Sequence, residues 1–182
     1  MMLAAQQPPL AYEKEVYLHT DIFSGMSKWF WAVAIAVSFV NAAIFWVRAR
    51  KKIAENTELA PGYHKLIKGF VLWGNIPWIV MGVGSTLGGV PTVFHFFRPR
   101  EGNPFVLAFF VAVVLLFVLG TYWLLFRDGA QMLVHHPGLF SYDFRTTREV
   151  KLFWFACLVG GLFGLAMMFT MDMPLPKYRS IR

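Results

Sequence analysis

The segment LIKGFVLWGNIPWIVMGVGSTLGGVP, residues 66–91, has the length of a transmembrane helix but contains many small and polar residues. In lipid, such residues are tolerated where neighbouring protein covers them and satisfies the backbone. Pro77 removes one helical hydrogen bond, so we expect a kink near Gly74. The sequence therefore predicts that this segment is a kinked, glycine-rich helix at the centre of a helical bundle.

The composition indicates a membrane protein. Of the 182 residues, 57% are hydrophobic and only 15% are charged, whereas an ordinary soluble domain has roughly 25% charged residues. Four apolar windows have the length of about 20 residues that a span requires, and a chain this short could not bury four such helices on every side in water. We predict an all-α membrane protein with four transmembrane helices in an antiparallel bundle, with spans near residues 27–48, 66–91, 104–127 and 151–171.

The spans divide the chain into three parts. Residues 1–26 are a mixed tail that could form an interfacial helix, residues 27–171 are the transmembrane domain, and residues 172–182 are a short basic tail. Ten of the 17 lysines and arginines belong to the side that carries the first and third connections. The positive-inside rule favours a cytoplasmic position for that side, with both termini outside, and a bacterial inner (plasma) membrane is the expected location.

Small residues at helical spacing predict close contacts between helices. Gly84 and Gly88 form a GxxxG motif in the second span, and Gly160 and Gly164 repeat it in the fourth, so we expect these two spans to pack together. The third span is almost uniformly bulky and is expected to face lipid. The residues expected at helix contacts are Ala34, Ser38, Asn41, Ala42, Asn75, Pro77, Gly82, Gly84, Ser85, Gly88, Gly89, Gly160, Gly161 and Gly164.

Two helix ends can be placed from local patterns. Thr146 or Thr147 could cap the fourth helix, with Glu149 in its first turn. The helical pattern of the third span could continue past Phe126 to Val134, before the sequence His-His-Pro-Gly ends it.

Histidine is the one residue type that suggests a cofactor. Neutral imidazole is a common metal and haem ligand, and the candidate cofactor-binding pairs are His19 with His95 and His64 with His135. None of the four lies at the middle of a span, so interfacial histidines without a ligand are the alternative. The single cysteine, Cys157, excludes an intramolecular disulfide. No metal site is assigned, and haem is the cofactor to test.

The net charge of +7 is explained by basic residues that flank the spans. The sequence RARKK, residues 48–52, follows the first span directly, and Arg48, Arg50, Lys51 and Lys52 could contact anionic lipid headgroups. No element that reads nucleic acid accompanies this cluster. The expected partners are the lipid bilayer and another membrane protein or a second copy of the chain, and not nucleic acid.

No signature fixes a reaction, and an enzyme is not expected. The sequence has no HExxH or GxSxG motif and no pair of acids inside a span. Asn75, Ser85 and Thr86 could line a transport path along the kinked helix, although the centres of the spans carry no charged residue. The favoured hypothesis is an accessory or structural subunit of a larger membrane complex, or a homo-oligomer. A component of a transporter or channel for small solutes or ions, and a haem- or metal-binding membrane protein, are the alternatives.

Overall fold

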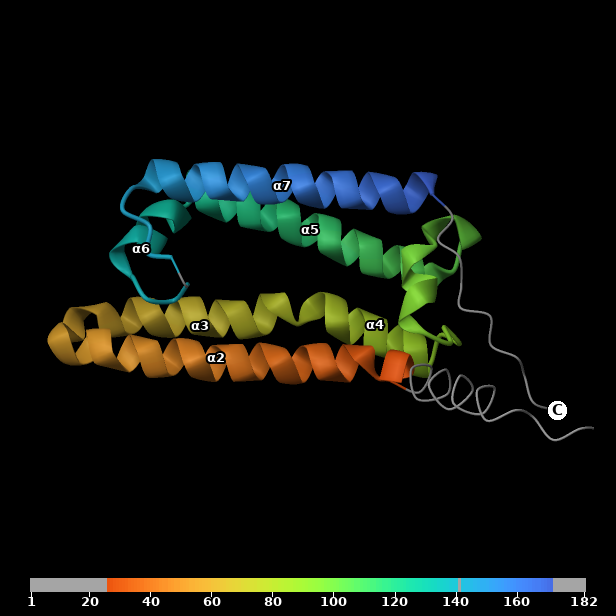
Figure 1. Cartoon of the computed structure of the whole chain (residues 1–182), viewed down its shortest axis with the longest axis horizontal. Helices are drawn as coiled ribbons and strands as arrows, with labels where there is room; N and C mark the ends of the chain where they lie inside the picture. Colours follow the sequence, from red (N-terminus) through yellow and green to blue (C-terminus); the bar gives the residue numbers. More distant parts are fainter. Residues whose placement is uncertain (1–25, 141, 172–182) are drawn as a thin grey trace, which may run out of the picture.

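The computed structural model describes residues 26–140 and 142–171, and the regular structure within these ranges is helical, with no strand (Figure 1). Most of the N-terminal tail and all of residues 172–182 lie outside the described residues, and so does the interfacial helix predicted in the tail. The elements are α2 (Phe30–Glu55), η1 (Thr57–Leu59), α3 (Ala60–Gly74), α4 (Ile76–Thr86), η2 (Val93–Phe97), η3 (Pro99–Glu101), α5 (Pro104–Phe126), α6 (Gly129–His135) and α7 (Thr147–Thr170).

Four stretches of helix are long and apolar enough to cross a membrane: Phe30–Glu55, Thr57–Thr86, Pro104–Phe126 and Thr147–Thr170. They coincide with the four predicted spans, so the prediction of an all-helical chain with four candidate transmembrane helices is confirmed. The cap of α7 is also confirmed, because the Thr146 side chain accepts a hydrogen bond of 3.3 Å from the backbone N–H of Glu149.

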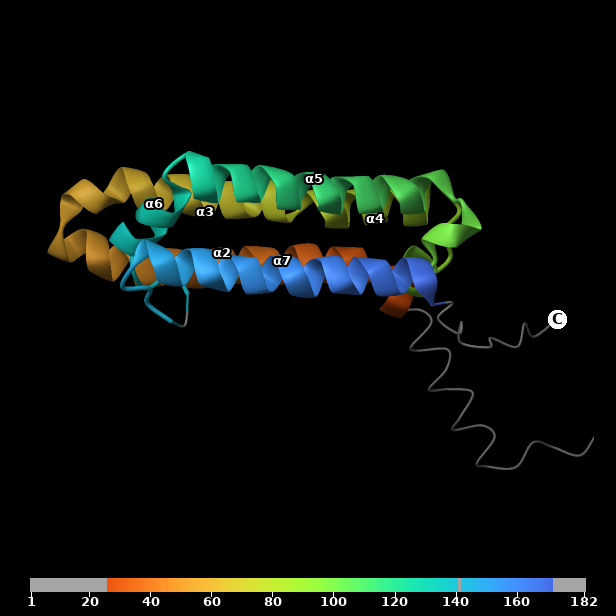
Figure 2. The ribbon, with the colours of Figure 1, turned by 90° about the horizontal axis from the view of Figure 1, so that it is seen from above.

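The long helices form two layers. In Figure 1, α2 lies beside α3 and α4 in one layer, and α5 and α7 form the other. Seen from above in Figure 2, α5 lies over α3 and α4, whereas α7 lies over α2. The short helix α6 lies at the end of the molecule where α2 passes into α3. The layers are therefore connected through η2 and η3 at one end and approached by α6 at the other.

The second span is interrupted in its middle. Helix α3 ends at Gly74 and α4 begins at Ile76, so that Asn75 separates them and Pro77 lies in the first turn of α4. The second span also ends earlier than its predicted limit at residue 91. Helix α4 stops at Thr86, and the chain leaves it through Gly89, whose φ of +64° is the left-handed conformation that glycine adopts at helix ends.

The predicted contact between the second and fourth spans is wrong. Helix α4 packs mainly against α2 and α5, and α7 packs mainly against α6 and α5. The expectation that the third span faces lipid is also wrong for one of its sides, because Val106, Phe109 and Phe110 of α5 are buried in the same apolar cluster as Met81 of α4. The reason is complementarity: glycines on one helix provide the space that bulky rings of another element fill.

Helices α5 and α7 have a reciprocal contact of this kind. A Cβ atom built on Gly120 of α5 would lie 3.0 Å from the Trp154 ring of α7, and one built on Gly161 of α7 would lie 2.5 Å from the Phe117 ring of α5. Each helix therefore contributes one aromatic ring and one notch, which is the space left by a glycine that has no side chain. The Trp154 ring is also fixed by its Nε1–H, which donates a hydrogen bond of 3.0 Å to Thr121 Oγ1.

The third helix does not continue to Val134 as the pattern suggested. It ends at Phe126, Asp128 adopts a left-handed φ of 57°, and α6 begins at Gly129. The Trp123 ring lies 2.6 Å from the position that a Cβ atom on Gly129 would occupy. The chain can therefore turn back beneath Trp123 because residue 129 has no side chain.

Candidate functional site

The contact between α2 and α4 contains a buried polar pair. The Trp31 ring of α2 lies over Gly82 of α4, 2.8 Å from the position of a Cβ atom there. Ser38 lies seven residues after Trp31 on α2, and Asn75 lies seven residues before Gly82, at the break between α3 and α4. Both are buried, and the Asn75 amide donates a hydrogen bond of 2.7 Å to the carbonyl oxygen of Val71.

This polar pair is not fully satisfied. Ser38 Oγ and Asn75 Oδ1 are both inaccessible and have no hydrogen-bond partner within the described residues. Of the other residues expected at contacts on α2, Ala42 is buried, and Ala34 and Asn41 are half-buried. Ser38 and Ala42 are thus the most buried of the small residues expected at contacts on α2.

The glycines of the second span receive aromatic rings from η2 and α5. The Phe96 ring approaches within 2.9 Å of the position of a Cβ atom on Gly84, and the Phe105 ring lies directly over Gly88. Ser85 is half-buried, whereas Gly89 is exposed and serves the turn rather than a helix contact. The GxxxG spacing thus corresponds to notches for rings and not to contact with a second glycine-rich helix.

The glycines of α7 divide into two kinds. Gly161 packs against Phe117, but no atom of another element lies within 4 Å of the Cβ position of Gly160 or Gly164. Ala156, four residues before Gly160, is exposed as well and extends the same face. Sequence reasoning missed Ala156, although its four-residue spacing could have found it. Helix α7 therefore presents a strip of small residues in which Ala156 and Gly160 are exposed and Gly164 is half-buried.

The histidines occupy separate places. His64 is stacked on Trp46, with ring centroids 5.0 Å apart, and His135 is exposed. His95 Nδ1 lies 3.0 Å from Thr92 Oγ1, and His19 lies outside the described residues. No group of three or more His, Cys, Asp or Glu side chains that could hold a metal occurs in the described ranges. Haem binding through these histidines stays a prediction.

The histidine that makes the most specific contact was not among these candidates. The ring of His136 covers Gly62 and stands edge-on to Tyr63, with centroids 4.9 Å apart. Tyr63 is fully buried, and its hydroxyl donates a hydrogen bond of 2.6 Å to the carbonyl oxygen of Pro137. Leu139 joins Tyr63 in an apolar cluster with Ala49 of α2. These contacts fasten the segment after α6 onto the first layer.

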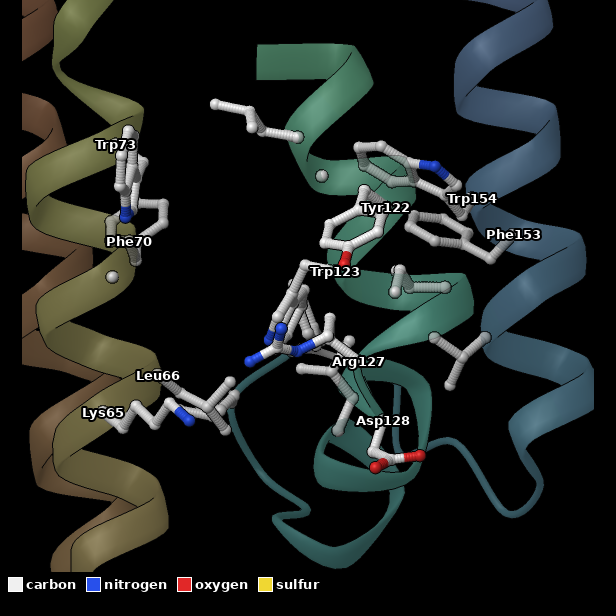
Figure 3. A pocket seen from close by; sticks show the side chains of 18 of the residues that line it. Lys65, Leu66, Phe70, Trp73, Tyr122, Trp123, Arg127, Asp128, Phe153 and Trp154 are labelled. Atoms are coloured by element: carbon white, nitrogen blue, oxygen red, sulfur yellow. The ribbon is translucent and has the colours of Figure 1, made fainter. Parts of the chain in front are cut away.

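A cavity of about 1040 Å³ lies between the contacts of Tyr63 with the segment after α6 and the contact of α4 with α5 (Figure 3). We call it the aromatic cleft because its walls are mainly rings and aliphatic side chains from α3, α5, α6, α7 and the loop after α6. The rings that Figure 3 labels are Phe70, Trp73, Tyr122, Trp123, Phe153 and Trp154.

Charged groups line one end of the aromatic cleft. Figure 3 shows Lys65 extending from α3 and Arg127 extending from the end of α5 toward α3. The Asp128 carboxylate also lines the cleft but lies on the side away from α3. Lys65 and Arg127 are exposed, and neither forms an ion pair within the residues that the structure describes. The interior of the cleft is therefore apolar, and this end of it is cationic.

Several predicted site residues lie elsewhere. None of Asn75, Ser85 and Thr86 lines the aromatic cleft, so a transport path along the second helix stays a prediction. The basic residues of positions 48–52 do not line it either; three of them are exposed, and Lys52 Nζ lies 3.1 Å from Glu55 Oε2. The position of Lys65 and Arg127 was not foreseen, because these residues are 62 positions apart in sequence and flank different spans.

Comparisons with models of known protein families, with curated protein sequences and with solved structures find no match to this chain.

Proposed function

We propose that the protein is a small integral membrane protein that acts through helix packing, as an accessory or structural subunit of a larger membrane complex. The observation that carries this proposal is the strip of Ala156, Gly160 and Gly164 on α7. In a bilayer, apolar helices gain little from burying surface, and association depends on close backbone approach at small residues. A strip of this kind supports contact with a helix of another protein or of a second copy.

The position of α7 supports the same proposal. None of the 18 residues in its most apolar window is buried within the chain, and Val150 near its start is the one buried residue of the helix. One side of α7 is held by Trp154 and Gly161 against α5, so the strip is presented by a helix whose orientation is fixed. A rigid strip loses little freedom when a partner binds.

The proposed membrane arrangement follows the hydropathy and charge. The four spans form an antiparallel bundle, the second is kinked at Gly74–Pro77, and the glycines of α4 are the packing sites of its central contacts. The end that carries α6 and the basic segment 48–52 faces the cytoplasm, and both termini lie outside, in a plasma membrane such as a bacterial inner membrane. The partners in this proposal are lipid and a membrane protein, with no nucleic acid.

The test compares leucine substitutions on two faces of α7. Gly160→Leu and Gly164→Leu would fill the strip, whereas Ala166→Leu adds bulk at another exposed position of the same helix. The intact particle would be extracted from its native membrane in mild detergent, without cross-linking, and its mass measured.

We expect the wild type and Ala166→Leu to form a particle heavier than the 20.8 kDa chain, and the two strip variants to lose the partner while their thermal unfolding in detergent stays unchanged. A particle of a small multiple of the chain mass would identify the partner as a second copy. If the strip variants keep the same particle mass as the wild type, the strip is not the partner surface and the proposal is wrong.

A further inference from the structure

The aromatic cleft has the dimensions of a ligand site. Its volume of about 1040 Å³ is at the upper end of the range of about 300–1,000 Å³ that small-molecule sites occupy. Both layers of helices line it, with Phe70 and Trp73 of α3 on one side and Trp154 of α7 on the other. The cleft therefore lies between the two layers and is lined by side chains of both.

The walls select an apolar occupant. The one polar ring nitrogen fixed at the wall, Trp154 Nε1, already donates to Thr121, and the surrounding side chains offer mainly carbon. Water gains few hydrogen bonds in such a space. A transmembrane helix is a straight rod with a diameter of about 10–12 Å. A flexible hydrocarbon chain needs neither a wide nor a continuous passage.

The charged end selects the headgroup. Lys65 and Arg127 approach this end from opposite walls and have no ion-pair partner in the described ranges, while Asp128 is turned to the far side. Guanidinium and ammonium groups donate to phosphate oxygens, and arginine does so through two parallel hydrogen bonds. The end also lies on the more basic side of the protein, where anionic lipid headgroups are attracted.

We propose that the aromatic cleft binds an anionic phospholipid, with an acyl chain among Phe70, Trp73 and Trp154 and the phosphate between Lys65 and Arg127. Asp128 gives this end one negative charge against two positive charges, which leaves it cationic. A lipid with one net negative charge is therefore favoured over a zwitterionic one. This site is separate from the strip on α7, so it does not rest on the proposed partner.

The chain carries its own reporter for this site. Cys157, the single cysteine of the sequence, is exposed and lines the aromatic cleft. An acyl chain in the cleft would cover its thiol. The rate at which N-ethylmaleimide modifies the full-length protein in mild detergent, with phosphatidylglycerol or phosphatidylethanolamine added to the micelles, thus reports occupancy directly.

The variants remove the two positive charges that line the cleft and leave its apolar side chains unchanged. Lys65→Gln with Arg127→Gln is compared with Lys68→Gln with Arg148→Gln, which removes one exposed cation from α3 and one from the first turn of α7, neither of which lines the cleft. Lipid retained through detergent exchange would be counted by native mass spectrometry for both double variants. All four positions are exposed, so the fold should persist, and circular dichroism would check it.

We expect phosphatidylglycerol, but not phosphatidylethanolamine, to slow modification of Cys157 and to be retained at one molecule per chain. Loss of the charge-assisted hydrogen bonds in the Lys65→Gln, Arg127→Gln variant should weaken retention by about tenfold, and the control variant should retain lipid as the wild type does. Equal protection of Cys157 by the two lipids would contradict the preference for an anionic headgroup. Cys157 modification that neither lipid changes, or equal retention by both double variants, would overturn the site itself.

Discussion

The hydroxyl of Tyr63 and the carbonyl oxygen of Pro137 are joined by a hydrogen bond of 2.6 Å across 74 residues of sequence. Tyr63 is fully buried in the first layer of helices, and Pro137 follows α6 in the connection to α7. This bond is therefore a direct link between the two layers at the end of the molecule opposite to the α4–α5 contact.

Replacing Tyr63 with phenylalanine should weaken this link. The change leaves the ring in place but removes the donor to Pro137, which we expect to lower the free energy of unfolding by about 1–3 kcal/mol. Tyr122→Phe is the matched control, because Tyr122 is 51% exposed and its loss of a hydroxyl should change little. Thermal unfolding in one detergent compares the two. A shift of the same size in both variants would show that the Tyr63 hydroxyl has no special role.

Adding one methyl group to a glycine should have opposite effects at two positions. Gly82→Ala brings a Cβ atom to about 2.8 Å from the Trp31 ring, and such overpacking costs about 1–3 kcal/mol. A Cβ atom on Gly160 would meet no other side chain or element of the described residues within 4 Å, so Gly160→Ala should keep or raise stability, by up to about 1 kcal/mol, because alanine favours the helix. Denaturation of the isolated chain in detergent measures both. Destabilisation by Gly160→Ala would contradict the open environment of that position.

Two hydroxyl groups should differ in their contribution to stability. Thr121 Oγ1 accepts from Trp154 Nε1 and donates to the carbonyl oxygen of Phe117, so Thr121→Val removes both bonds, leaves a half-buried donor unpaired and should cost about 1–3 kcal/mol. Ser38 Oγ is buried without a partner, so Ser38→Ala should change the unfolding free energy by less than about 0.5 kcal/mol or increase it. A large loss in Ser38→Ala would show that the Ser38 hydroxyl has a hydrogen-bond partner in the folded protein.

The orientation can be tested with single cysteines in a Cys157→Ser background. Arg50→Cys and Arg145→Cys belong to the end with α6, and Glu101→Cys belongs to the other end; all three positions are exposed. We expect a membrane-impermeant maleimide to reach the first two from the cytoplasmic side and the third from outside. The reverse pattern would show that the protein has the opposite orientation in the membrane. Gly102 and Gly138 are poor sites for this purpose, because their φ values of +72° and +87° strain any residue with a side chain.

The sequence was sufficient for the features that depend on local chemistry. The length and hydropathy of each span identified four helices, and the threonine and glutamate spacing limited the cap of α7 to Thr146 or Thr147, of which the structure has Thr146. Both signals lie within a few residues of the structure they specify. The break of α5 at Asp128 was missed, because it depends on Trp123 covering the bare backbone of Gly129.

The partners of the helices could not be read in the same way. Glycine spacing shows that something approaches the backbone closely, but the bulky residue that fills the notch can come from any part of the chain. Phe105 was assigned to the lipid-facing third span, yet its ring covers Gly88. Likewise, no local pattern connects Lys65 with Arg127, so the charged end of the aromatic cleft emerged only from the arrangement of the layers.

The reciprocal contact between α5 and α7 restricts how these helices can move. The Trp154 ring occupies the notch at Gly120, and the Phe117 ring occupies the notch at Gly161. Sliding one helix along the other would drive both rings against the backbone on either side of their notches, whereas a small separation frees them together. Shear between α5 and α7 is therefore blocked, and any rearrangement of this pair has to be a hinged opening.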